Sequence, residues 1–155
     1  MNIEIRRIRY SEGEKARLLS YMYEVDESFP RPIHTFGDME ELAETWLRRH
    51  IVLFAMDGDT VCGVMIENVE DMDTRIGHTV IKAISASYRH KGIMTRLRTE
   101  MRRLAKEAGM NCIMENINPK NLASVNEMIT AGAHYVGQIT EPCPEQWDLL
   151  FVLPL

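Results

Sequence analysis

A short basic turn followed by a long amphipathic segment is the part of the sequence best suited to chemistry. The turn is Arg89-His90-Lys91-Gly92, and it joins a run rich in β-branched residues to a stretch whose apolar residues recur every three or four positions. Such spacing is typical of an amphipathic helix. A strand that enters a helix through a glycine-containing turn directs free N–H groups, and the positive end of the helix dipole, at one point. The turn is therefore suited to bind an anion such as a pyrophosphate.

The helix predicted after this turn has an apolar face and a basic face. Its apolar positions are Ile93, Leu97, Met101, Leu104 and Ala108. Five basic residues lie mostly off that face, and we interpret them as its solvent-exposed side: Arg96, Arg98, Arg102, Arg103 and Lys106. The Arg89-x-x-Gly92 spacing alone does not separate an anion site from an ordinary connection between a strand and a helix.

The composition limits the classes of protein to which the chain can belong. Its 155 residues fit one domain and are enough to bury a hydrophobic core. A hydrophobic content of 45% with 26% charged residues is typical of a soluble globular protein. The net charge of −5 argues against a general nucleic-acid binder, although it allows a local basic patch.

The cysteines and the amino-terminal sequence bear on the compartment. Cys62, Cys112 and Cys143 are odd in number and lack the spacing of metal ligands, so we expect reduced thiols and no metal site. The opening MNIEIRRIRY has no apolar core of signal-peptide type, and no run approaches the roughly 18 consecutive apolar residues of a membrane helix. We expect a soluble cytoplasmic protein.

Capping and breaking residues locate the first elements. Apolar and polar residues alternate over residues 2–9, which predicts a strand. Ser11-Glu12-Gly13-Glu14 is a capping box that begins a helix, and Phe29-Pro30-Arg31-Pro32 ends it. Asp38 is a plausible N-cap of a second helix, with basic residues at its end near His50. Asp57-Gly58-Asp59 then predicts a hairpin between strands over residues 51–56 and 60–67.

The remaining elements alternate between strand and helix. Residues 75–86 are rich in β-branched side chains and predict the central strand, and Gly109 ends the long helix. A strand over 111–117 precedes Asn118-Pro119, which we interpret as the start of the last helix. Its expected buried face is Leu122, Val125, Met128 and Ile129, and Gly132 ends it. Strands over 133–139 and 146–153, separated by Pro142-Cys143-Pro144, complete the chain.

This order predicts an α+β (mixed α/β) fold, with a twisted mixed sheet of about seven strands flanked by about four helices in a single domain over residues 1–155.

The run from Ile84 to Met94 resembles the coenzyme-binding motif of the GNAT superfamily of acyl-CoA-dependent N-acyltransferases. That motif has an Arg or Gln, two residues, a Gly, one residue and then a Gly or Ala. Arg89 and Gly92 match it, whereas Met94 stands where the family prefers a small residue.

A second motif supports the resemblance. Asn121-x-x-Ser124-Val125, followed by Gly132, is similar to the family's Asn-x-x-Ala/Ser segment before a terminal glycine. The element order also resembles that of the GNAT fold, so the resemblance covers nearly the whole chain. It implies that acetyl-CoA is the co-substrate and that its acetyl group passes to a primary amine.

The resemblance also implies where the coenzyme binds. The backbone at Ile84, Ser85 and Ala86 would bind the pantetheine arm and polarise the thioester carbonyl. The diphosphate would be surrounded by Arg89, His90, Lys91, Gly92, Ile93, Met94 and Thr95. Asn121 and Ser124 would contact the distal part of the coenzyme.

Two residues are candidates for the base that deprotonates the amine. In the histone-acetyltransferase branch a glutamate lies six residues before the position matched by Ile84, and His78 occupies that place here. An imidazole titrates near pH 6.5 and suits the task, but His78 is equally compatible with a strand histidine that has no role. Glu115 is the second candidate, with a structural ion pair as the alternative. Glu67 and Asn68 either line the acceptor site or are ordinary surface polar residues.

The position of the general acid departs from the family. Many members protonate the leaving thiolate with a tyrosine four residues before the terminal glycine of the last helix, and Met128 stands there. Methionine cannot donate a proton. Tyr135 could substitute, or it could serve in packing, and solvent could also supply the proton. The alternative hypothesis is therefore a catalytically silent sensor or interaction module that binds acyl-CoA.

The partners follow from the same reasoning. The acceptor is expected to be a small-molecule or peptide amine, with no nucleic acid and no membrane among the partners. The loop between the first two helices, which contains His34 and Phe36, either covers the acceptor or is a plain surface loop. The apolar final segment LLFVLPL could pair across a homodimer.

Overall fold

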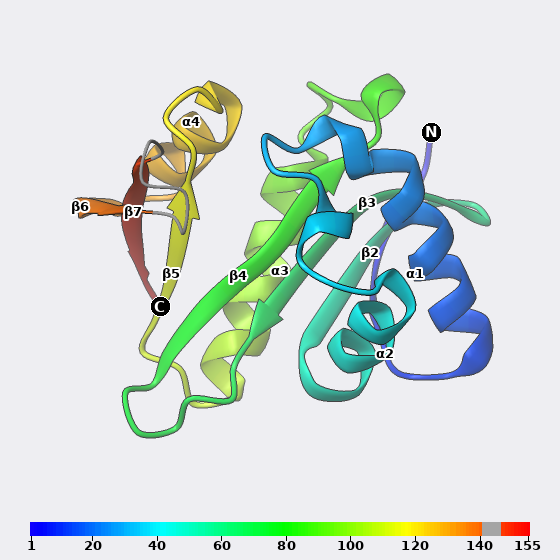
Figure 1. Ribbon diagram of the computed structural model, residues 1–155, viewed down its shortest axis with the longest axis horizontal. Helices are drawn as coiled ribbons and strands as arrows, with labels where there is room; N and C mark the ends of the chain where they lie inside the picture. The colour runs from blue at the N-terminus through cyan, green and yellow to red at the C-terminus, as the bar shows by residue number, and fades with distance from the viewer. Residues whose placement is uncertain (141–146) are drawn as a thin grey trace.

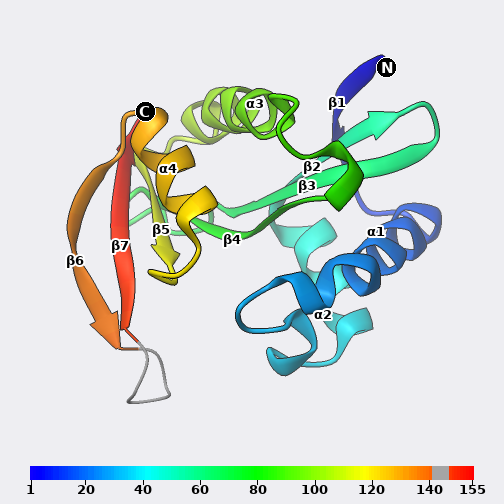
Figure 2. The same cartoon turned by 90° about the horizontal axis from the view of Figure 1, so that it is seen from above.

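A computed structural model describes residues 1–140 and 147–155 and shows one seven-stranded sheet with helices on both faces (Figures 1 and 2). The strand order is β1-β2-β3-β4-β5-β7-β6. The strands are β1 (Ile3–Ile8), β2 (Ile51–Asp57), β3 (Thr60–Asn68), β4 (Ile76–Ile84), β5 (Cys112–Ile117), β6 (His134–Thr140) and β7 (Trp147–Pro154). The helices are α1 (Glu12–Val25), α2 (Met39–Arg49), α3 (Ile93–Glu107) and α4 (Leu122–Thr130). Three short 3₁₀ turns are η1 (Asp26–Ser28), η2 (Ile33–Thr35) and η3 (Ala86–Tyr88). The predicted α+β class, strand number and helix number are confirmed.

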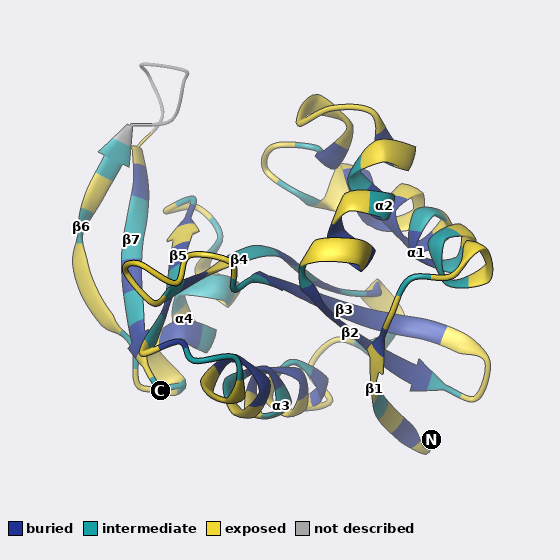
Figure 3. Cartoon of the chain, turned by 90° about the horizontal axis from the view of Figure 1, so that it is seen from below, coloured by how far each residue is buried: buried dark blue, intermediate teal, exposed yellow. Residues whose placement is uncertain are grey.

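Each face of the sheet carries its own hydrophobic core (Figure 3). On one face α1 and α2 pack over the middle strands, with Leu18, Met22 and Trp46 among the buried residues. On the other face α3 and α4 cover the sheet through Leu97, Met101 and Met128 among others. Burial of these side chains on both faces is the main source of stability for such a three-layer arrangement.

The divergence of β4 and β5 is the irregularity that creates the site. All neighbouring strands are antiparallel except β4 and β5, which pair in parallel only at Ile76↔Cys112, Gly77↔Ile113 and His78↔Met114. Beyond this point the two strands separate, as Figure 1 shows. One edge of β4 from Thr79 to Ile84 therefore has no neighbouring strand within the described part of the chain.

A bulge in the pairing of β3 and β4 sets which side chains share a face. Ile66 pairs with Ile81, but the next residue, Glu67, pairs with Thr79, so Val80 has no partner in the register. Side chains normally alternate along a strand, and the extra residue brings Thr79 and Lys82 to the same face. Both side chains lie on the α3 face of the sheet, where Thr79 bonds Glu67 and Lys82 reaches α4.

The capping signals confirm the starts of α1 and α2. The Ser11 hydroxyl accepts a 3.1 Å hydrogen bond from the N–H of Glu14, and the Asp38 carboxylate accepts one of 3.0 Å from the N–H of Glu41. These bonds satisfy N–H groups that the helix itself leaves free.

The predicted start of α4 at Asn118-Pro119 is wrong. The Asn118 side chain accepts from the N–H of Lys120 at 2.9 Å, and its carbonyl accepts from the N–H of Asn121 at 2.8 Å, so this segment forms a turn. The cap is Asn121, whose side chain accepts from the N–H of Ser124 at 3.2 Å. The expected buried face is also partly wrong, because Leu122 and Ile129 are 66% and 57% exposed whereas Met128 is fully buried.

One further expectation is wrong, and another concerns residues that the structure does not describe. Arg98 is not on the solvent-exposed side of α3, because it is only 2% exposed and binds carboxylates between the helix and the sheet. The Pro142-Cys143-Pro144 connection lies outside the described residues, while Cys62 and Cys112 are free thiols. Across residues 1–140 and 147–155, none of the helices has both the length and the apolar character that a bilayer span requires.

Candidate active site

The amino-terminal end of α3 is exposed and lacks a side-chain cap. Gly92 occupies the N-cap position with φ 73°, in the left-handed region that favours glycine, and a Cβ built there would meet no atom within 4 Å. No described side chain accepts a hydrogen bond from the first turn at this cap, in contrast to α1, α2 and α4. The first turn itself, which is fully described, carries no acidic residue. Its N–H groups are free to bind an anion from outside the protein.

Two basic side chains flank this end of the helix. The Arg89 Nε donates to the carbonyl of Ile84 at 3.1 Å, and the Lys91 Nζ donates to the carbonyl of Ser87 at 2.8 Å. Both residues are exposed, as is His90, whose φ of 61° is also left-handed. Together with the helix dipole, these cations make the turn from Arg89 to Gly92 a positively charged corner at the end of β4.

The backbone at the end of β4 is already hydrogen-bonded. The N–H of Ser85 donates to the carbonyl of Cys62 at 3.0 Å, and the carbonyls of Ser85 and Ala86 accept from Tyr88 and Arg89. The carbonyl of Ile84 accepts from the Arg89 side chain. The backbone edge with no strand beside it in the described structure therefore lies slightly earlier in β4, from Thr79 onward.

The side chain of Ser85 faces α1. Its hydroxyl donates to a Glu24 carboxylate oxygen at 2.6 Å and lies 3.3 Å from the Tyr21 hydroxyl. Burial raises the pKa of Tyr21 to about 12, so this phenol stays protonated and acts as a hydrogen-bond donor. The contacts fix the end of β4 against α1.

His78 lies at the point where β4 and β5 begin to separate. It is exposed, and it pairs with Asn68 of β3 and Met114 of β5 in the sheet register. Its neighbours Gly77 and Thr79 both face Glu67 on the α3 side, so His78 points to the α1 face of the sheet.

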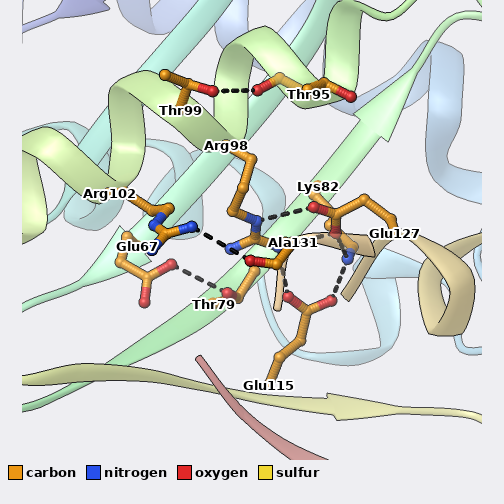
Figure 4. A network of polar contacts seen from close by, with 10 residues as sticks. All are labelled: Glu67, Thr79, Lys82, Thr95, Arg98, Thr99, Arg102, Glu115, Glu127 and Ala131. Atoms are coloured by element: carbon orange, nitrogen blue, oxygen red, sulfur yellow. Dashed lines mark hydrogen bonds and ion pairs between the residues drawn. The ribbon is translucent and has the colours of Figure 1, made fainter. Parts of the chain in front are cut away.

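Glu115 belongs to a buried cluster of four charged side chains in the space between β4 and β5 (Figure 4). Its carboxylate contacts the Lys82 Nζ at 2.5 Å and the Arg98 Nη2 at 2.8 Å. Glu127 of α4 contacts the same two cations, at 2.5 Å and 2.9 Å. We call Lys82, Arg98, Glu115 and Glu127 the ion cluster. It joins β4, β5, α3 and α4 at the strand divergence.

Mutual pairing keeps Arg98 and Glu127 charged. Burial opposes the charge of Arg98, but the two glutamates hold its pKa above the ordinary value. Burial likewise tends to raise the pKa of Glu127, yet Arg98 and Lys82 keep it below its usual range. Glu115 is therefore engaged by two cations and is not a free carboxylate.

Glu67 is a second buried carboxyl group on this face. It is 0% exposed, so the alternative of an ordinary surface polar residue is wrong. The Thr79 hydroxyl donates to its Oε2 at 3.0 Å, while its Oε1 has no hydrogen-bond partner in the described part of the chain. Burial raises the pKa of Glu67 to about 8, so this carboxyl is largely protonated at neutral pH.

The remaining candidate residues lie on α4 and β6. Asn121 and Ser124 form the cap of α4, which leaves them half-buried at its exposed end. Met128 is fully buried, and its thioether offers no proton. Tyr135 is 57% exposed, and its ring contacts that of Phe151 edge-on at 5.9 Å between centroids.

Sequence reasoning missed Lys82, Arg98 and Glu127 as members of one cluster. Two weak signals were present. Lys82 is a cation within an otherwise mostly apolar central strand, and Arg98 lies at helical spacing from Met94, Met101 and Ala105. Neither signal identifies the partner, because the glutamates come from later elements.

Comparisons with known proteins agree on the family. The model of the acetyltransferase (GNAT) family matches residues 19–127, which is more than half of the chain. A search of curated proteins found no match.

Three solved structures illustrate the likeness of fold. An acetyltransferase of the GNAT family from Streptococcus pneumoniae superposes with a TM-score of 0.80 at 17% identity, covering 99% of this chain and 100% of that one. The ribosomal-protein-S18-alanine N-acetyltransferase from Escherichia coli gives 0.77 at 11% identity, covering 99% and 94%. The PaiA N-acetyltransferase from Thermoplasma acidophilum, solved in complex with coenzyme A, gives 0.71 at 16% identity and covers both chains fully, at 100% each. With the family model, the fold and the geometry in agreement, the chain belongs to the GNAT acetyltransferase family.

Proposed function

We propose that this protein is an N-acetyltransferase that transfers the acetyl group of acetyl-CoA to a primary amine by direct attack of the amine on the thioester. The observation that carries the proposal is the uncapped amino-terminal end of α3, where Gly92 leaves N–H groups free beside Arg89 and Lys91. An anion of high charge fits such a corner, because it receives hydrogen bonds and a favourable dipole together.

The residues of the site fit a coenzyme of this kind. The turn from Arg89 to Thr95 would hold the diphosphate, and the free edge of β4 from Thr79 to Ile84 would bind the amides of the pantetheine arm. Asn121 and Ser124, at the exposed start of α4, would lie beside the distal part. The bound coenzyme supplies an activated acetyl group as a thioester and leaves as a thiol.

His78 is the proposed base. A primary amine such as a lysine side chain has a pKa of about 10.4 and must lose a proton before it attacks. His78 is exposed and lies where the strands begin to separate, whereas the Glu115 carboxylate is bound by Lys82 and Arg98. The exposed imidazole is accessible to a bound amine, whereas the Glu115 carboxylate is occupied by two cations.

The acceptor is proposed to be a small molecule or a peptide with a primary amine. The Escherichia coli neighbour acts, by its name, on an alanine of a ribosomal protein, which supports acceptors of the peptide class. The Thermoplasma acidophilum neighbour was solved with coenzyme A, which supports the proposed co-substrate.

A panel of amines tests the proposal. Release of coenzyme A thiol from acetyl-CoA would be measured with polyamines, amino acids and peptides of free amino terminus, with calorimetric binding of acetyl-CoA in parallel. Amine-dependent thiol release supports the proposal. Absence of acetyl-CoA binding would contradict it outright.

One observation favours a second function, that of a silent acyl-CoA sensor. Met128 is fully buried at the position where many family members have a tyrosine acid, and Tyr135 is turned toward Phe151. Tight binding of acetyl-CoA with no thiol release for any amine would favour the sensor over the enzyme.

A further inference from the structure

The leaving thiolate is the part of the proposed reaction for which the family's usual residue is missing. Met128 cannot donate a hydrogen bond, and burial keeps water from its side chain. A side chain that stabilises the thiolate in place of this residue would border the divergence of β4 and β5.

Lys82 is placed for this role. Its side chain extends from β4, within the stretch that pairs with β3 but has no strand on its β5 side in the described part of the chain. Only 7% of this side chain is exposed. The Nζ lies 2.5 Å from a Glu127 oxygen, and Glu127 directly precedes Met128 on α4. The ammonium therefore contacts the residue that directly precedes the family's acid position.

One of the three N–H groups of the Lys82 ammonium has no acceptor among the described residues. An ammonium has three N–H groups, of which Glu127 accepts one at 2.5 Å, while the Glu115 carboxylate faces another as an ion pair at 2.5 Å. No third acceptor is found within residues 1–140 and 147–155. The third N–H is thus available to a ligand that enters between the strands.

The charges of the ion cluster balance before the thiolate forms. Lys82 and Arg98 offset Glu115 and Glu127, and Arg98 binds both glutamates. Glu67, a further buried carboxyl group on this face, is kept largely protonated at pH 7 because burial raises its pKa to about 8. A sulfur that becomes negative here therefore meets a paired environment that still offers cationic donors rather than unpaired carboxylates. These donors are the third N–H of Lys82 and the Nη1 of Arg98, which has no hydrogen-bond partner among the described residues.

On the basis of the proposed function, we propose that Lys82 is a further catalytic residue, whose free N–H stabilises the leaving thiolate. The amine nitrogen bonds to the carbonyl carbon, the C–S bond breaks, and its electron pair stays on sulfur beside the ammonium. In this step Lys82 donates a hydrogen bond without giving up its proton, and the thiolate takes its proton from solvent on release. The contribution is that of a preorganised donor aimed at developing charge.

The variants must separate this role from folding. Lys82→Met alone leaves two buried carboxylates short of a cation and could unfold the protein. The double variant Lys82→Met with Glu127→Gln removes one charge of each sign and keeps the cluster neutral, with Glu127→Gln alone as its reference. Lys82→Arg keeps the cation, and Lys106→Met, on the exposed end of α3, is the matched control.

The primary measurement is the pKa of the coenzyme A thiol when bound, followed by the ultraviolet absorbance of the thiolate. We expect the wild-type protein and Lys106→Met to lower this pKa by about one pH unit relative to free coenzyme A. The double variant should lose this effect, and Lys82→Arg should retain most of it. An unchanged thiol pKa in the wild-type complex, or absence of coenzyme binding, would overturn the inference.

Turnover provides the second measurement. For an acceptor found in the amine panel, the double variant should lose about 100-fold in kcat relative to Glu127→Gln, with acetyl-CoA affinity changed less than about three-fold. Equal kcat in the two variants would overturn the inference while leaving the acetyltransferase intact. A protein that binds coenzyme A with a lowered thiol pKa but transfers no acetyl group would instead overturn the proposed enzyme and keep the role of Lys82 toward the thiol.

Discussion

Glu67 of β3 and Thr79 of β4 form a partly buried hydrogen bond of 3.0 Å, in which the threonine hydroxyl donates to one carboxyl oxygen of the glutamate. The other oxygen has no hydrogen-bond partner among the described residues and lies 3.0 Å from where a Cβ on Gly77 would be. This pair stands beside the ion cluster, and burial raises the pKa of Glu67 more than the cations Arg98 and Lys82 lower it. An uncharged carboxyl group can remain in such a place, whereas a carboxylate is costly there.

The Glu67→Gln variant should therefore remove a pH-dependent loss of stability. The folded pKa of about 8 lies above the unfolded value near 4.3, so the folded state binds the extra proton, and stability falls as pH rises from about 4.5 to 8. Between pH 5.5 and 8.5 the titration of Glu67 should lower the free energy of unfolding of the parent protein by about 3 kcal/mol, and Glu67→Gln should not show this loss. Urea unfolding of both proteins at the two pH values checks this. An equal fall in the free energy of unfolding of both proteins would contradict the raised pKa of Glu67.

The cap of α4 gives a second prediction. Asn121→Ala removes the side-chain acceptor of the Ser124 N–H and should lower the free energy of unfolding by about 1 kcal/mol. Pro119→Ala, at the residue first expected inside the helix, serves as the control and should change it by less than about 0.5 kcal/mol. Denaturant melts measure both. A larger loss for Pro119→Ala than for Asn121→Ala would contradict the observed helix start.

A third prediction concerns His34 and Asp26 in the segment between α1 and α2. The His34 Nδ1 lies 2.5 Å from an Asp26 oxygen, and this contact raises the pKa of His34 and lowers that of Asp26. The histidine contribution is complete below its unfolded pKa of about 6.5 and is lost as pH rises through the higher folded value. The aspartate contribution is present above about 3.8 and is lost as pH falls through the lower folded value.

His34→Ala should therefore lower Tm most between about pH 4 and 6.5, and less at pH 9. His134→Ala, an exposed histidine of β6, is the control and should show no such window. Thermal unfolding followed by circular dichroism across this pH range measures the difference. A constant difference in Tm from pH 4 to 9 would rule out the ion pair as its source.

The role of His78 gives a fourth prediction. His78→Ala should lower kcat by about 100-fold near neutral pH, because the amine loses its proposed base. The Kd of acetyl-CoA should change little, because the imidazole points to the α1 face of β4, whereas α3 with its diphosphate site covers the other face. His78→Gln keeps the size and polarity of the side chain without its base and should lose as much. Equal turnover of variant and parent across pH 6 to 9 would remove His78 from the mechanism.

Much of the fold could be predicted because local signals and the global fold agree. Ser11 and Asp38 cap the helices they were expected to cap, and the Asp57-Gly58-Asp59 turn joins β2 to β3. The start of α4 could not be predicted, because Asn118 and Asn121 offer the same capping chemistry three residues apart. Asn118 instead closes a turn on Lys120, a choice that depends on the exit of the chain from β5.

The candidate site was predictable only where it depends on adjacent residues. The turn from Arg89 to Gly92 could be recognised because strand, glycine and helix follow one another directly. The ion cluster could not be, because Lys82 and Glu127 are 45 residues apart and meet only where β4 and β5 diverge. Arg98 was assigned to the wrong side of α3 for the same reason, since its charge was visible in the sequence but its buried partners were not.

The central claim is that the amino-terminal end of α3 binds the coenzyme diphosphate. Gly92→Asp places a negative charge at this end, and Gly109→Asp is a matched control because Gly109 also has a left-handed φ, of 92°, at the opposite end of the same helix. The helix between the two glycines has 15 residues and a rise of about 1.5 Å per residue, so it separates them by a length of about 22 Å.

Calorimetric titration with acetyl-CoA tests this most directly. Gly92→Asp should weaken binding about ten-fold or more, while Gly109→Asp should bind as the wild type does. Equal affinity of all three proteins for acetyl-CoA would contradict the placement of the diphosphate at α3.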